Sequence, residues 1–214
     1  APLFRESDLK AQAYLADIDF QSVARRPEDF DIQTIIARYY AMIELVDDKI
    51  GEILASLEHS GQLENTLIIF TSDHGETLGD HGLLYKGCRF YEGLVRVPLI
   101  LSWPDHFTPG LVSDALVELT DIAPTLLDVC GLPRPYRMQG KSLLPLLNGD
   151  SKKIRDYVRS EYYHVLMPRE DNGFEGSYGT MYRDERYKLI IYHNQGIGEL
   201  FDLENDPGEF TNLW

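Results

Sequence analysis

The stretch "TLIIFTSDHGETLGDHGLLYKG", Thr66 to Gly87, joins an apolar run to a cluster of acids, histidines and glycines. Its run Leu67–Phe70 is typical of a strand buried on both faces of a parallel sheet. The run ends at Asp73-His74-Gly75. Because ligands bind at the carboxyl ends of strands in open α/β sheets, the stretch predicts both a strand and a site.

An amphipathic helix is predicted directly before this strand. Apolar residues recur there at three- and four-residue steps: Ile35, Ile36, Tyr39, Tyr40, Ile43, Val46, Ile50, Ile53, Leu54 and Leu57. The pattern fits a helix of about seven turns. Asp31 is suited to cap its N-terminus and Gly61 to end it in a left-handed conformation. A helix followed by a buried strand indicates an α/β protein.

Two further elements are predicted after the quoted stretch. The run "VRVPLILSW", from Val95, is a second strand, and "LVELTDIAPTLLDVCGLP", from Leu116, is a helix. Pro124 falls where a first helical turn tolerates proline, and Gly131 closes the helix. We expect Cys130 to be a small buried residue before that stop.

The pattern changes beyond about Lys153, where tyrosines alternate with charges and turn signals separate short segments. This pattern predicts an antiparallel meander. We place a domain boundary near residue 150, giving residues 1–150 and 151–214. The fold class is therefore α/β: part of a parallel or mixed sheet flanked by helices, followed by a small antiparallel β subdomain.

Composition excludes several classes of partner. The 214 residues carry a formal net charge of -15 with a pI near 4.7, so nucleic acid and anionic membranes would be repelled. The apolar runs are too short to span a bilayer. Two cysteines, Cys88 and Cys130, make no disulfide framework, and the compartment stays open.

The residues after the strand suit a divalent cation and an anion. Asp73 and His74 are chemically suited to bind a hard cation, and Gly75 allows the chain to turn away sharply. Because such a cation takes about six ligands, the others would come from elsewhere. Lys86, in the same loop, would offer a positive charge to an anionic oxygen. Taken singly, each of these features is also common in ordinary turns and on solvated surfaces.

In combination the motifs resemble those of a known family. "FTSDHGETLGDHGLLYKGCRFYEGLVRVPLILSWP" resembles the C-terminal signature of the sulfatases, within the alkaline-phosphatase-like superfamily. "RYYAMIELVDDKIGEILASLE" and "LTDIAPTLLDVCGLPRP" resemble helices of that family. "ELFDLENDPGEFTNLW" resembles its closing motif. The resemblance covers roughly residues 30–150 and 180–214.

The resemblance implies an enzyme that hydrolyses sulfate esters of small molecules or glycans. It implies one divalent cation, most often Ca²⁺, with Mg²⁺ and Mn²⁺ as alternatives, in a periplasmic, secreted or lysosomal-type setting. Asp73 and His74 match two metal ligands, although many sulfatases have Asn in place of His74. Lys86 matches the catalytic lysine that contacts the sulfate, and His81 is expected to face the substrate cleft. Glu92 and Arg96 are expected to form structural ion pairs.

Two parts of the family pattern are missing. Sulfatases make a formylglycine nucleophile from Cys-x-Pro-Ser-Arg and take further ligands from an early Asp-Asp pair. Neither motif is present, and the sequences around Cys88 and Cys130 do not fit the first. We therefore expect a C-terminal portion of a larger hydrolase, inactive without its N-terminal half.

Two other functions are compatible with these residues. A phosphonate monoester or phosphodiester hydrolase of the same superfamily has the same Asp-His-Gly. Its two-metal members need one more histidine, for which His106, His164 and His193 lie in no convincing context. A non-catalytic module that binds sulfated glycans through the tyrosine-rich tail is the second alternative.

Overall fold

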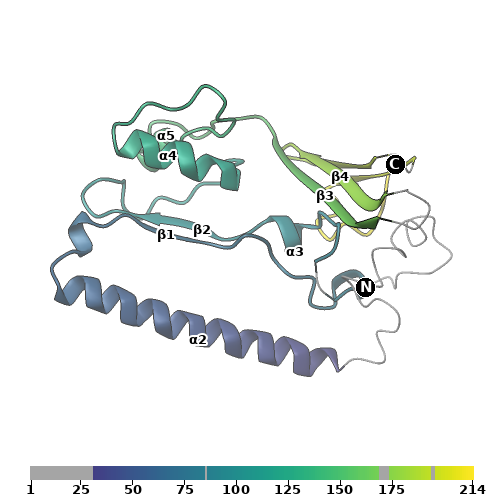
Figure 1. Ribbon diagram of the computed structural model, residues 1–214, viewed down its shortest axis with the longest axis horizontal. Coiled ribbons are helices and arrows are strands. Elements are labelled where there is room, and N and C mark those ends of the chain that lie inside the picture. Colours follow the sequence, from purple (N-terminus) through teal and green to yellow (C-terminus); the bar gives the residue numbers. More distant parts are fainter. Residues whose placement is uncertain (1–30, 85, 169–173, 194–195) are drawn as a thin grey trace. The chain divides into compact units, whose positions relative to one another are not determined.

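The computed structural model describes residues 31–84, 86–168, 174–193 and 196–214 (Figure 1). The described helices and strands confirm the predicted α/β class. The helical elements are α2 (Ile32–His59), η2 (Leu63–Asn65), η3 (Asp80–Gly82), α3 (Glu92–Val95), η4 (Leu119–Asp121), α4 (Ile122–Val129) and α5 (Leu144–Leu147). The strands are β1 (Ile68–Thr71), β2 (Leu99–Ser102), β3 (Val158–Pro168), β4 (Phe174–Arg183), β5 (Tyr187–Tyr192) and β6 (Ile197–Asp202).

Helix α2 begins and ends as the sequence predicts. The Asp31 carboxylate accepts hydrogen bonds from the backbone N–H of Thr34 at 3.2 Å and from its hydroxyl at 2.6 Å. At the other end Gly61 has a φ of 67°, and the N–H of Gln62 donates to the Leu57 carbonyl at 2.9 Å. Both ends therefore have partners for backbone groups that the helix itself leaves unsatisfied.

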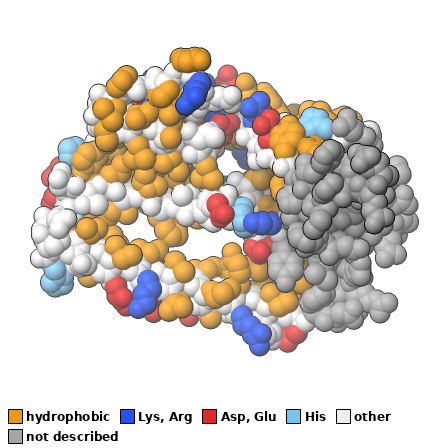
Figure 2. All heavy atoms as spheres, viewed as in Figure 1, with side chains coloured by type: hydrophobic (Ala, Val, Ile, Leu, Met, Phe, Trp, Pro, Cys, Tyr) orange, Lys and Arg blue, Asp and Glu red, His pale blue; other side chains and the backbone are white. Residues whose placement is uncertain are grey.

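The apolar stripe of α2 is half-buried at some positions and exposed at the others. The helix contains no buried residue, and Ile53, for example, is 61% exposed. Figure 2 shows hydrophobic side chains along this helix, at the lower edge of the view. Such a stripe normally faces a core. The predicted helix is therefore confirmed, but its apolar side chains are not buried. Within the described chain, no helix has the length and apolarity that a membrane span requires.

The prediction of a parallel, fully buried strand at β1 is wrong for the described residues. β1 pairs antiparallel with β2, with Ile68 opposite Ser102 and Thr71 opposite Leu99. A parallel pair needs a crossover connection, usually a helix, whereas α3, the α-helix between these strands, has only four residues. Neither strand is buried throughout: β1 is half-buried except at exposed Phe70, and β2 alternates between half-buried positions and exposed ones such as Ile100.

Helix α4 confirms the predicted helix, but it is shorter than the apolar run. Pro124 is buried in its first turn, and Gly131 follows with a φ of 65°. Thr120 precedes the helix within the 3₁₀ turn η4. The prediction for Cys130 is wrong, because this residue is exposed. It lies at the C-cap of α4, where the residues that follow are exposed as well.

The predicted meander is confirmed as a four-stranded sheet in the order β3-β4-β5-β6. β5 pairs antiparallel with β4, where Met181 lies opposite Ile190, and with β6, where Ile190 lies opposite Glu199. One face of the sheet carries the largest hydrophobic cluster, which comprises Leu83, Cys88, Phe90, Tyr91, Met181, Ile190, Tyr192 and Phe201. Half of these residues come from residues 74–91, the segment that begins at His74 and is called the motif loop below, rather than from the sheet.

Contacts divide the chain into two compact units that are not continuous in sequence. The first contains the described parts of residues 1–45 with His74–Val97 and Arg159–Trp214, and the second contains Val46–Asp73 and Pro98–Val158. The motif loop thus groups with the C-terminal sheet. The domain boundary near residue 150 stays a prediction. In the contact analysis, the second unit ends at Val158 and the first resumes at Arg159.

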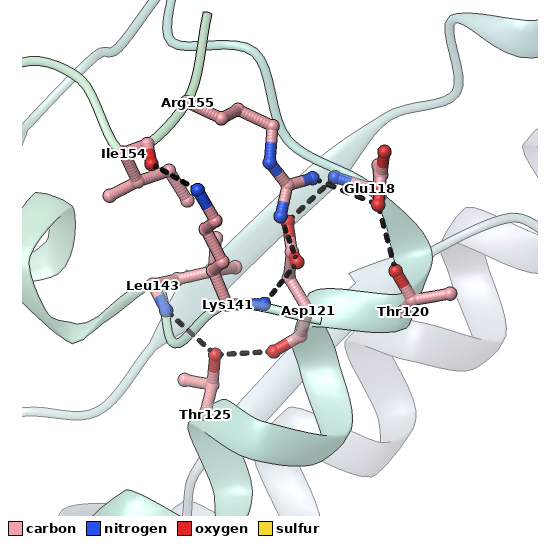
Figure 3. A network of polar contacts seen from close by, with 8 residues as sticks. All are labelled: Glu118, Thr120, Asp121, Thr125, Lys141, Leu143, Ile154 and Arg155. Atoms are coloured by element: carbon pink, nitrogen blue, oxygen red, sulfur yellow. Dashed lines mark hydrogen bonds and ion pairs between the residues drawn. The ribbon is translucent and has the colours of Figure 1, made fainter. Parts of the chain in front are cut away.

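A buried polar network organises the second unit (Figure 3). The Asp121 carboxylate is fully buried and accepts from the backbone N–H of Glu118 at 2.8 Å and of Lys141 at 2.7 Å. It also pairs with the guanidinium of buried Arg155. The Thr125 hydroxyl donates to the Asp121 carbonyl at 2.6 Å. One carboxylate therefore connects the start of α4 to two segments that follow it.

Arg155→Met should destabilise the second unit strongly. The change removes the positive charge beside Asp121 and leaves a buried carboxylate uncompensated, which costs about 3–5 kcal/mol. Urea unfolding with a local probe on α4 measures the loss. Lys49→Met removes an exposed ion pair with Glu52 and should cost well under about 1 kcal/mol. Equal losses for the two variants would contradict a structural role of the network.

Candidate functional site

The structure brings His74 and Lys86 into direct contact. The Lys86 Nζ lies 2.7 Å from His74 Nε2, and His74 Nδ1 lies 2.8 Å from the Gly75 carbonyl oxygen. A carbonyl only accepts, so Nδ1 carries the proton, and an ammonium only donates, so Nε2 offers its lone pair. The contacts thus fit the tautomer of His74 in which Nδ1 donates and Nε2 accepts.

Gly75 makes the turn that gives His74 this position. Its N–H donates to the Leu94 carbonyl at 2.8 Å. A Cβ on Gly75 would lie 1.9 Å from the Gly93 carbonyl oxygen, closer than any side chain allows. Glycine is required here because the backbone passes directly against α3, and this approach holds the turn after His74.

Internal hydrogen bonds fix the loop between Gly75 and Lys86. The hydroxyl of buried Thr77 donates to the Leu83 carbonyl at 2.9 Å, and the Gly79 N–H donates to the same carbonyl at 2.8 Å. Leu78 and His81 both have positive φ values, 47° and 55°. Such values are unfavourable for residues with a side chain and persist where surrounding contacts hold them.

Apolar anchors attach this loop to the C-terminal sheet. Leu83 and Cys88 are fully buried, and Phe90 is 3% exposed. Gly179 on β4 lets Phe90 approach closely, because a Cβ there would lie 2.7 Å from the Phe90 ring. The four loop residues of the core therefore bracket Lys86 on both sides along the chain.

His81 packs against aromatic rings. Its ring stacks on Tyr91 with centroids 3.9 Å apart and lies 5.1 Å from the Phe210 ring. It also lines a pocket of about 210 Å³ that contains the carboxylates of Asp80, Glu92 and Glu209. Burial raises the pKa of the Tyr91 hydroxyl well above its usual value. A substrate contact of His81 stays a prediction.

Asp73 is the sequence neighbour of His74 and has an exposed side chain. It follows β1 closely, as the sequence predicts. Among the residues that the structure describes, no group of three or more His, Cys, Asp or Glu side chains is arranged to hold a metal ion. The metal-ligand roles of Asp73 and His74 therefore stay predictions.

A buried lysine that the sequence analysis missed lies beneath the loop. Lys188 is fully buried, and its Nζ lies 2.7 Å from a carboxylate oxygen of each of Glu92 and Glu209. The predicted ion pair of Glu92 is confirmed, whereas no ion pair between Arg96 and another described residue is found. Alternation in "YKLIIY" was a usable signal, because it places Lys188 on the same face as Ile190 and Tyr192.

The residues present fit one part of a metal site. A metal-binding histidine usually donates its second ring N–H to a carbonyl or carboxylate, which fixes the ring and the tautomer. His74 makes this type of contact with Gly75. Its Nε2 lone pair and a carboxylate on the adjacent Asp73 are donors that a divalent cation accepts. The arrangement is therefore suited to supply two ligands.

Two family models together match nearly the whole chain, including the candidate site. The family model "Sulfatase" matches residues 7–132, and "N-sulphoglucosamine sulphohydrolase, C-terminal" matches residues 79–214. An N-acetylglucosamine-6-O-sulfatase of Bacteroides thetaiotaomicron is 34% identical over 213 residues, which cover 99% of this chain and 35% of the relative. The chain spans about a third of the length of the curated relatives it matches.

Solved structures give the same result. A protein in complex with its substrate D-glucosamine-2-N,6-O-disulfate is 37% identical, with a TM-score of 0.71 over 82% of this chain and 35% of that protein. The phosphonate monoester hydrolase of Agrobacterium radiobacter is 35% identical, with a TM-score of 0.74 over 86% of this chain and 38% of that protein. Both confirm the fold expected for an alkaline-phosphatase-like protein.

Gly75→Ala tests the close approach that holds His74. The added methyl group meets the backbone of α3, so we expect destabilisation of about 1–3 kcal/mol or more. Gly51→Ala, in the interior of α2 with no atom within 4 Å of the new Cβ, should instead stabilise by about 0.5–1 kcal/mol. Denaturant unfolding of both variants measures the difference. Similar midpoints for the two variants would show that α3 does not constrain Gly75.

Proposed function

The chain belongs to the sulfatase family, and from this premise we propose that it is the C-terminal part of a metal-dependent enzyme that hydrolyses sulfate esters. In this proposal Asp73 and His74 bind the cation, and Lys86 binds the sulfate group. The observation that carries the proposal is the geometry at His74, where Nδ1 is held by Gly75 and Nε2 presents its lone pair toward Lys86.

Lys86 is suited to the anionic part of a substrate. Its side chain is exposed, and its ammonium donates to a neutral nitrogen rather than to a carboxylate. A cation on His74 would use the same Nε2 lone pair, so Lys86 would then have its charge available for a sulfate oxygen. Once bound, a divalent cation supplies Lewis-acid polarisation of the ester oxygens. Lys86 adds a fixed positive charge where negative charge develops.

The identity of the cation and of the nucleophile completes the proposed site. We propose that Ca²⁺ is the cation, with Mg²⁺ or Mn²⁺ as alternatives, and that the nucleophile is a formylglycine contributed from an N-terminal region. Sulfated amino sugars are the substrate class that the comparisons favour. This proposal is supported by a structure in complex with its substrate D-glucosamine-2-N,6-O-disulfate, which matches this chain at 37% identity.

A phosphonate monoester hydrolase is the second candidate function. It is supported by the similarity to the enzyme of Agrobacterium radiobacter, which matches this chain as well as the sugar sulfatase does. The two activities use the same type of anion, a tetrahedral group with charged oxygens, so Asp73, His74 and Lys86 would serve either. Turnover of paired sulfate and phosphonate esters with one leaving group separates the candidates.

Asp73→Ala should abolish activity and lower the metal content of the complete enzyme, because the variant loses one charged ligand. Metal analysis of the purified protein and an aryl sulfate assay measure both effects. Asp114→Ala, an exposed carboxylate elsewhere in the chain, should change neither. Wild-type activity in the Asp73 variant would contradict this assignment.

Lys86→Met should separate sulfate binding from metal binding. The substitution keeps the length of the side chain and removes its charge, so kcat should fall by about 100- to 1000-fold. Metal content should be unchanged, since Lys86 is not a proposed ligand. The same metal analysis and assay test both parts. Loss of metal together with activity would show that Lys86 supports the fold of the site rather than the substrate.

A further inference from the structure

A buried ion cluster connects three segments that are distant in sequence. The Lys188 cluster comprises Lys188 on β5, Glu92 at the start of α3, Glu209 in the closing motif and Arg183 on β4. The Lys188 Nζ donates to the Phe90 carbonyl at 2.8 Å and to Glu209 Oε1 at 2.7 Å, and it forms an ion pair with Glu92 Oε1 at 2.7 Å. Lys188 therefore donates two hydrogen bonds and has two carboxylates as counter-charges.

Charges within the cluster balance. Arg183 Nε lies 3.3 Å from Glu92 Oε1, so two cations face two carboxylates. Burial raises the pKa of Glu209 above its usual value, and the charge of Lys188 opposes that rise. Removing Lys188 would leave buried Glu209 without this counter-charge and half-buried Glu92 with Arg183 as its remaining described cation. A buried charge without its partner is strongly unfavourable, so the loss of one member destabilises the contacts of the others.

Glu209 has a second contact that fixes α3. Its Oε2 accepts a hydrogen bond from the backbone N–H of Glu92, the first residue of the helix, at 2.7 Å. Glu209 has a φ of 57°, a conformation that is unfavourable for a residue with a side chain. The Asp206 carbonyl accepts from the Glu209 N–H at 3.0 Å and closes this turn. The strained turn thus places one carboxylate on both Lys188 and the start of α3.

Helix α3 in turn supports the residue that follows His74. The Leu94 carbonyl on α3 accepts the Gly75 N–H at 2.8 Å, and the Gly75 carbonyl accepts His74 Nδ1–H at 2.8 Å. An unbroken series of contacts therefore runs from Lys188 through Glu209, α3 and Gly75 to the His74 imidazole. Every hydrogen bond in this series is 2.8 Å or shorter.

We propose that Lys188 and Glu209 are positioning residues for His74: the closing motif holds α3, and α3 holds the turn that sets the orientation of the imidazole. The proposal rests on the proposed function in so far as His74 is a metal ligand. It assigns a purpose to the acid of the closing "DPGE" sequence, which lies 135 residues beyond His74. Neither residue touches the substrate or the cation.

The first experiment measures hydrogen exchange at the Gly75 amide, in the complete protein and without added metal. Lys188→Met should speed exchange about tenfold or more, because the hydrogen bond to Leu94 loses its support. Glu209→Gln keeps the shape of the side chain and should have a smaller effect in the same direction. If Lys188→Met does not fold, Glu209→Gln decides. Arg155→Met removes an equally buried ion pair from the other unit and should leave Gly75 exchange unchanged.

The second experiment measures Ca²⁺ affinity by titration calorimetry in the same variants. Loss of support around a ligand typically weakens metal binding about 10- to 100-fold, so Lys188→Met and Glu209→Gln should raise the Kd within that range. Arg155→Met should leave the Kd within about twofold of the wild type, although it lowers the melting temperature.

The two readouts distinguish failure of this proposal from failure of the proposed function. If Ca²⁺ binding to the wild-type protein is absent or does not depend on Asp73, the proposed metal site is wrong. Hydrogen exchange at Gly75 would still test the positioning role of Lys188 and Glu209. Unchanged exchange in both cluster variants would overturn the proposal. Equal changes in Arg155→Met and Lys188→Met would overturn it as well, since they would reflect stability alone.

Discussion

A fully buried lysine needs acceptors and counter-charges around its amino group, and the partners of Lys188 connect distant segments of the first unit. Its acceptors are the Phe90 carbonyl and Glu209, from the motif loop and the closing motif, and it also pairs with Glu92 at the start of α3. None of these segments can shift alone without exposing or orphaning a buried charge. The apolar contacts of Leu83, Cys88 and Phe90 act in the same direction and fix the loop on the sheet.

Features that depend on neighbouring residues could be predicted from the sequence. The ends of α2, the position of Pro124 in α4 and the order of the meander follow from caps, turns and periodicity, and the structure confirms them. Pairing between distant segments has no such local signal. The prediction of a parallel strand at β1 was wrong for this reason. The packing of residues 83–91 on strands about 100 residues later was not predicted either.

The candidate site divides in the same way. Asp73, His74 and Lys86 could be selected from the motif and its resemblance to a family, since their spacing is local. The tautomer of His74 and its support by α3 required the structure, because they depend on Gly75 meeting Gly93 and Leu94 across an 18-residue loop. The sequence thus selected the candidate groups, and the fold explains why His74 holds one orientation.

A crystal structure of the complete protein with bound Ca²⁺ tests the central claim most directly. The account predicts a cation at about 2.3–2.6 Å from an Asp73 carboxylate oxygen, with His74 Nε2 also among its ligands. It also predicts that Lys86 has left His74 while Nδ1 still donates to the Gly75 carbonyl. A cation bound elsewhere, or a Lys86 that still donates to Nε2 at saturating Ca²⁺, would contradict it.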